Sequence, residues 1–142
     1  MKKVLCSLLA LVLAAALAAC SPMPGKEESR ALIDEFLADL SQQKDEEAAA
    51  LFCSESQAEP GDILQLRTYL AGTGMDLSQG LSVEAYTGVH VTYTPLRTFL
   101  HYSFTAVCGE YSVPFTVTLT KKGSTLFLYQ VSISSSGSQI TV

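Results

Sequence analysis

The sequence of 142 residues lacks most of the short motifs that mark catalytic and metal-binding proteins. It has two histidines, His90 and His101, and no HxH, HExxH or CxxC spacing, so the pattern predicts no metal site. It has no GxSxG elbow for a nucleophilic serine and no glycine-rich phosphate loop. We therefore expect no metal ion and no cofactor.

Positive charge is also scarce. The chain has 9 Lys and Arg against 14 Asp and Glu, which gives a net charge of −5. Nucleic acids and anionic lipid surfaces are bound through clusters of basic residues, and Lys121-Lys122 is too short a run to form one. The composition therefore argues against nucleic acid as a partner.

The one long apolar run lies at the N-terminus. After Met1-Lys2-Lys3, residues 4–19 contain Ser7 as their only polar side chain. As a helix this run would cover about 24 Å, which is short of a bilayer core of about 30 Å, so it is typical of a signal and not of a permanent span. It ends in Leu17-Ala18-Ala19-Cys20, which resembles the lipobox of bacterial lipoproteins.

The lipobox resemblance implies a signal peptide over residues 1–19 and a lipid on Cys20, whose acyl chains, such as palmitate, insert into the membrane. The protein would then be anchored to the extracytoplasmic face of the cell membrane, in the cell envelope. The alternative is an ordinary secretory signal followed by a coincidental cysteine. Residues 20–27 contain Pro22, Pro24 and Gly25, a composition that suits a tether.

Residues 28–133 are predicted to form a single α+β domain that begins with three helical segments. The first has its apolar residues at helical spacing: Leu32, Ile33, Phe36, Leu37 and Leu40. Asp45 is a candidate N-cap for the second segment, and Pro60 and Asp62 suit the start of the third.

Near Leu81 the apolar period changes from 3.6 to 2, and four antiparallel strands are predicted from there to Ile133. In the first, the odd positions are the apolar face, with a bulge or bend at Gly88. The core face of the second is ambiguous, although its even positions are the more apolar. Pro114 predicts a bulge or an edge in the third. The Ser-rich residues 134–142 are expected to form a flexible tail, and whether their apolar residues pack back is left open.

This order of elements resembles the nuclear transport factor 2-like superfamily, which includes ketosteroid isomerase. The residues that carry the resemblance are the helix junction Lys44-Asp45-Glu46-Glu47-Ala48-Ala49-Ala50-Leu51-Phe52 and the hairpin Gly123-Ser124-Thr125-Leu126-Phe127-Leu128-Tyr129-Gln130-Val131. The resemblance implies a curved, cone-like sheet with helices packed on it. A cystatin-like domain, with one helix on a sheet and extra helices, is the alternative fold.

Members of this superfamily enclose a conical pocket, and the resemblance points to Tyr102, His101, Glu84 and Tyr69 as pocket residues. The alternative is that the tyrosines pack in the core or at an edge of the sheet and that the histidine lies at the surface. Among these residues we find no motif for the ketosteroid isomerase arrangement, in which a carboxylate base faces a tyrosine and a protonated acid. We therefore expect a non-catalytic domain that binds a small molecule, a peptide or another envelope protein. The alternatives are a small pocket enzyme of the isomerase or dehydratase type, and a structural module that forms homodimers through the outer face of the sheet. The alternation places four side chains on that outer face: Tyr86, His90, Leu126 and Leu128.

If Cys6 leaves with the signal and Cys20 carries lipid, two cysteines remain for a disulfide. A bridge between Cys53 and Cys108 would close a loop of about 56 residues and contribute roughly 4 kcal/mol. The alternative is a pair of buried thiols that pack as small apolar groups.

Overall fold

The computed structural model describes residues 25–135 and 137–142, so the predicted signal, Cys20 and most of the tether lie outside the described residues. Three helices come first: α2 (Lys26–Ser41), α3 (Asp45–Ala50) and α4 (Pro60–Gly72). Five strands follow: β1 (Ser82–Tyr93), β2 (Thr98–Cys108), β3 (Tyr111–Lys122), β4 (Thr125–Ser135) and β5 (Ser138–Thr141). Within these residues no helix is long and apolar enough to cross a membrane. The α+β class is confirmed.

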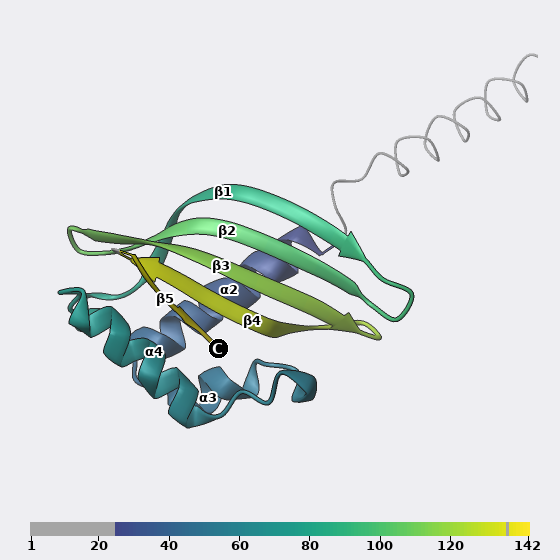
Figure 1. Cartoon of the computed structure of the whole chain (residues 1–142), viewed down its shortest axis with the longest axis horizontal. Helices are drawn as coiled ribbons and strands as arrows, with labels where there is room; N and C mark the ends of the chain where they lie inside the picture. Colours follow the sequence, from purple (N-terminus) through teal and green to yellow (C-terminus); the bar gives the residue numbers. More distant parts are fainter. Residues whose placement is uncertain (1–24, 136) are drawn as a thin grey trace, which may run out of the picture.

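The strands form one antiparallel sheet in the order β1-β2-β3-β4-β5. The sheet is curved, and α2 lies across one of its faces, in contact with β1 and β4, while α4 lies near β5 (Figure 1). The three helices therefore leave the opposite face of the sheet uncovered by helix. We call the face toward α2 the inner face and the opposite face the outer face.

The sheet has one strand more than predicted, because the residues expected to form a flexible tail form β5. Residues 138–141 pair with residues 132–135 of β4, and the backbones of Val142 and Val131 exchange two hydrogen bonds. Farther along the same edge, Phe52 forms a bridge to Leu128. The Ser-rich composition concealed a short hairpin that covers the edge of β4, which would otherwise have unpaired backbone groups.

The core lies between α2 and the inner face of the sheet. The predicted apolar residues Ile33, Phe36, Leu37 and Leu40 of α2 are fully buried. The even positions of β2 are buried and the odd ones half-buried, which settles the ambiguity of that strand. Burial of each large apolar side chain contributes about 1.5–3 kcal/mol, so this layer is the main source of stability.

Two β-bulges in β1 overturn the simple alternation predicted for that strand. The register shifts between Val83 and Ala85, and again between Tyr86 and Gly88, as the glycine had suggested. Each bulge adds one residue and so reverses which face the following side chains point to, and the second bulge restores the predicted faces from Val89 onward. Tyr86 therefore packs in the core against Phe104, whereas Ala85 is exposed.

A third bulge reverses the faces in β4. The register shifts between Thr118 and Leu119 of β3, where Gln130 and Leu128 are their partners. As a result Leu128 is fully buried on the inner face, although the alternation had placed it on the outer one. By contrast, β3 has no register shift at Pro114, and this residue has a strand partner only in β2, so it lies at a local edge of the sheet, which is one of the two alternatives predicted there. Pairing with β4 begins at Phe115.

The helix starts follow the sequence in one case and depart from it in the other. At α4, Pro60 is in the first turn, and Glu59 and Asp62 form a reciprocal capping box. Asp45 does not cap α3, because its carboxylate instead accepts two hydrogen bonds from Arg67 of α4, both of 2.8 Å. This bidentate contact ties α3 to α4, and it raises the pKa of Arg67.

We predict that Asp45→Ala lowers the free energy of unfolding by about 1 kcal/mol, because the contact with Arg67 is bidentate and both side chains are only about one-fifth exposed (21% and 17%). Urea denaturation measures this effect. The matched control is Glu46→Ala, which removes an exposed carboxylate from the same turn and should change stability by less than about 0.5 kcal/mol. Equal losses in the two variants would show that the contact adds nothing.

Candidate ligand-binding groove

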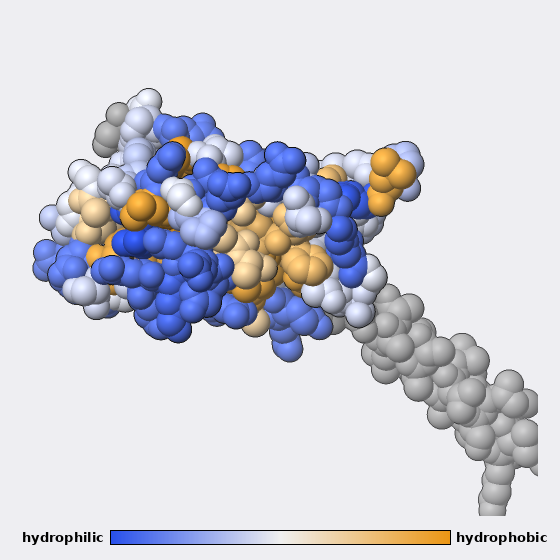
Figure 2. Space-filling model, turned by 90° about the horizontal axis from the view of Figure 1, so that it is seen from below, coloured by the Kyte–Doolittle hydropathy of each residue, from blue (hydrophilic) through white to orange (hydrophobic). Residues whose placement is uncertain are grey.

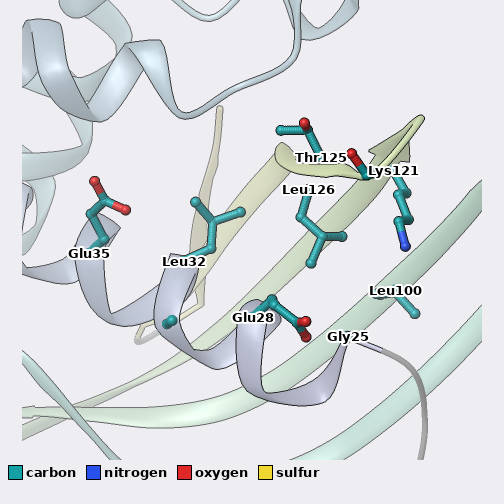
Figure 3. A pocket seen from close by; sticks show the side chains of 10 residues that line it. Gly25, Glu28, Leu32, Glu35, Leu100, Lys121, Thr125 and Leu126 are labelled. Atoms are coloured by element: carbon teal, nitrogen blue, oxygen red, sulfur yellow. The ribbon is translucent and has the colours of Figure 1, made fainter.

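A groove of about 720 Å³ lies between the first half of α2 and the hairpin that joins β3 to β4. Figure 3 shows the α2 side chains on one side and Lys121, Thr125 and Leu126 on the other. The groove is lined by Gly25, Glu28, Ala31, Leu32, Glu35, Leu100, Lys121, Ser124, Thr125 and Leu126. None of these residues was among the four predicted to line a pocket.

Helical spacing explains the α2 side of the groove. Glu28, Leu32 and Glu35 follow one another at intervals of four and three residues, so they lie on the same side of the helix. This side is next to the buried stripe that contacts the sheet. Leu32 is therefore partly buried against the core, while the two carboxylates remain at the exposed rim.

The sheet side of the groove follows from the bulge in β4, which turns Leu126 toward the inner face. Leu126 and Leu100 supply apolar surface there, and Lys121 supplies one positive charge. The groove therefore has apolar surface on both sides, two carboxylates on one wall and one ammonium group on the other. This arrangement can bind an apolar group and a charged group of the same molecule.

A second hollow of about 400 Å³ continues the groove, because the two share Leu100 and Lys121. It extends toward the turn between β1 and β2, where Val91, Tyr93 and Arg97 line it. In Figure 2, hydrophobic surface bordered by hydrophilic residues lies close to where the described chain begins. The two hollows together form an elongated site.

The structure does not bring the four predicted pocket residues together. Tyr102 is fully buried under α2, whereas Glu84 is exposed at the first bulge of β1. The hydroxyl of Tyr69 is 3.1 Å from the backbone oxygen of Ser138, so this side chain ties α4 to β5. His101 lies on the outer face, between Thr92 and Thr118. These residues do not form an acid–base pair.

The hydroxyls of Tyr102 and Tyr86 have no hydrogen-bond partner in the described part of the chain, and neither do Ser29 Oγ and Arg30 Nε. The two tyrosine rings contact each other edge to face, with centroids 5.9 Å apart, and the Arg30 guanidinium lies 4.6 Å from the centre of the Tyr86 ring. Burial raises the pKa of Tyr86 to about 12. This group of polar atoms lies within the core.

The outer face brings together the two histidines that the sequence treated as unrelated. His90 and His101 are directly opposite each other on β1 and β2, with ring centroids 5.3 Å apart. Burial, and next the nearby His90, lower the pKa of His101. In the described ranges no cluster of three or more His, Cys, Asp and Glu side chains is placed to hold a metal ion.

Cys53 and Cys108 are both buried free thiols, so the second of the two cysteine alternatives matches the structure. The backbone N–H of Cys53 donates to the backbone oxygen of Leu128 in β4. Leu128 lies opposite Leu119 of β3, which in turn lies opposite Leu100 of β2, so Cys53 is level with Leu100. Cys108 lies eight residues farther along β2, about 26 Å away, whereas a disulfide needs Cα atoms within about 7 Å. The Cys108 thiol instead donates to the backbone oxygen of Asp76 (2.9 Å), and burial raises its pKa.

No protein-family model matches this chain, and no curated protein or solved structure is similar enough to count as a match.

We predict that Tyr102→Phe raises the free energy of unfolding by about 1 kcal/mol, because it removes a buried hydroxyl that has no partner in the described chain. Thermal and urea denaturation measure the change. The control is Tyr111→Phe at a half-exposed position, which should have almost no effect. A loss of stability in Tyr102→Phe would instead show that a water molecule or a ligand atom satisfies this hydroxyl.

Proposed function

We propose that this protein is a lipoprotein anchored to the cell membrane through Cys20, whose domain binds a small amphipathic molecule with a cationic group in the groove beside α2. The groove is the observation that carries the ligand-binding part of this proposal. Its volume of about 720 Å³ lies within the usual range for small-molecule sites, about 300–1,000 Å³. The lipobox carries the anchoring part.

The charges of the groove favour a cation over an anion. Glu28 and Glu35 outnumber Lys121 on its walls, and residues 20–76 have 12 acidic against four basic side chains. A positive group on the ligand gains from this potential, while its apolar part contacts Leu32, Leu100 and Leu126. An anionic ligand would have only Lys121 to pair with, because Arg97 of the adjoining hollow already forms an ion pair with Glu55.

The place of the groove in the chain fits the anchoring proposal. Gly25 lines the groove, and it follows Cys20 by five residues. Five extended residues span at most about 18 Å, so a lipidated Cys20 would hold Gly25, at one end of the groove, within that distance of the membrane surface. Molecules that partition into or leave the membrane would then be close to the site.

We also infer that the domain belongs with the nuclear transport factor 2-like proteins. The order of elements supports this inference, since three helices precede an antiparallel sheet and α2 packs across its inner face. In that superfamily the space between helix and sheet is where ligands bind. The groove beside α2 is the corresponding place in this chain.

Lipidation is tested directly in cells by labelling with radioactive palmitate. The wild-type protein should take up label, and globomycin, which blocks lipoprotein signal peptidase, should cause an unprocessed form to accumulate. Cys20→Ala should take up no label, whereas Cys6→Ala should be labelled like wild type and serves as the control. Equal labelling of wild type and Cys20→Ala would exclude the anchor at this cysteine.

The ligand class is tested with a fluorescent apolar probe, N-phenyl-1-naphthylamine, and a matched pair of dodecyl amphiphiles. Dodecyltrimethylammonium should displace the probe at concentrations at least tenfold lower than dodecyl sulfate, and Glu28→Gln with Glu35→Gln should abolish this difference without abolishing probe binding. Leu126→Lys should abolish probe binding itself, because it places a charge in the groove.

The control for Leu126→Lys is Leu64→Lys, since Leu64 is 49% exposed on α4 and does not line the groove. The control variant should bind the probe like wild type. If both lysine variants bind the probe equally, the groove is not the site. Equal displacement by the two amphiphiles in wild type would contradict the preference for a cation.

A further inference from the structure

The outer face of the sheet presents two imidazoles at one point, independently of the groove. His90 and His101 are paired across β1 and β2, and no register shift lies between them and the turn that joins the strands. The Nε2 atoms of the two rings lie 3.2 Å and 3.1 Å from one oxygen, Thr92 Oγ1. Both nitrogens therefore converge on the same small volume at the surface.

The second nitrogen of His101 is held by Thr118, whose Oγ1 lies 3.0 Å from His101 Nδ1. In the tautomer with its hydrogen on Nδ1, His101 donates to this hydroxyl and leaves a lone pair on Nε2, on the side of Thr92 and His90. Metal-binding histidines are commonly oriented in this way, by a hydrogen bond from the nitrogen that does not bind the metal. Thr118 is largely buried, so its position is well fixed.

We propose that His90 and His101 bind one divalent transition-metal ion, Cu²⁺ most tightly, through their two Nε2 atoms, with water completing the coordination. Imidazole is a ligand that suits copper, nickel and zinc, and copper has the highest affinity in this series. Two side-chain ligands and open positions describe an exposed site that holds its ion weakly and exchanges it.

A metal ion would take the place that the Thr92 hydroxyl occupies between the two rings. Metal–imidazole bonds are about 2.0–2.1 Å long, so binding needs the Thr92 side chain to rotate away and the two Nε2 atoms to move toward the ion. His90 is exposed on β1, which is the edge strand of the sheet, and its side chain is free to make most of this movement. Phe99 lies beside the other ring, with centroids 6.4 Å apart, and limits the movement of His101.

The experiment is a Cu²⁺ titration of the full-length protein, purified in detergent and followed by electron paramagnetic resonance with electron spin-echo envelope modulation, which counts coordinated imidazoles. The chain contains only these two histidines, so every imidazole signal comes from them. We expect one Cu²⁺ per chain with two coordinated imidazoles. His90→Asn and His101→Asn should each show one imidazole and an affinity at least tenfold weaker.

Thr118→Val tests the role of the supporting hydroxyl. It keeps both histidines and the shape of the side chain, and it should weaken Cu²⁺ binding by about tenfold. The matched control is Thr116→Val, at an exposed position two residues away on the same strand, which should bind Cu²⁺ like wild type.

Three results would overturn the proposal. One is a single coordinated imidazole in the wild-type protein. Another is an affinity that is unchanged when both histidines are replaced, which would place the ion at the N-terminus or at backbone groups. The third is a two-imidazole signal that is lost on dilution, at the same concentration at which sedimentation shows a dimer dissociating. The ion would then bridge histidines of two chains and not of two strands of one chain.

Discussion

The packing of α2 across the inner face of the sheet is the constraint on which the rest of the structure depends. Its 16 residues give a helix about 24 Å long, whereas strands of 11 or 12 residues are about 36–40 Å long. One helix therefore cannot cover the strands from end to end. The groove lies where α2 begins, between the first half of the helix and the hairpin that joins β3 to β4.

The sequence predicted the class of the fold and most of its elements because those depend on local signals. Three such predictions are confirmed: the apolar stripe of α2, the start of α4 at Pro60 and the change from helix to strand near Leu81. The faces were predicted wrongly for Ala85 and Tyr86 in β1 and for Leu126 and Leu128 in β4, since each bulge inserts one residue and reverses the alternation after it. The positions of the bulges depend on the curvature of the whole sheet, which a short stretch of sequence does not determine. The exposed Ala85 and the buried Leu128 are the direct result.

The candidate site was missed for a related reason. The chemical types of four residues suggested one pocket, but chemical type does not determine which face of the sheet a side chain occupies. These residues are Tyr102, His101, Glu84 and Tyr69. The groove is instead made of ordinary residues, such as Glu28 and Leu126, which form a site only because the start of α2 lies opposite the β3–β4 hairpin. The pairing of His90 with His101 could have been predicted from the turn between β1 and β2. The turn after Tyr93 is closed by Thr94 and Arg97, which fixes the register of β1 on β2 back to His90.

Strand β2 contributes consecutive residues to both proposed sites, Leu100 to the groove and His101 to the metal site. Because successive side chains of a strand point to opposite faces, the ligand and the ion would be separated by the sheet itself and would not touch. The inner face can accept an apolar molecule, because Leu32 of α2 and Leu100 and Leu126 of the sheet form an apolar surface in the groove. The outer face carries both histidines and the threonines beside them, and a hydrated ion suits these polar groups. The one-sided placement of the helices thus divides the chemistry of the sheet between its two faces.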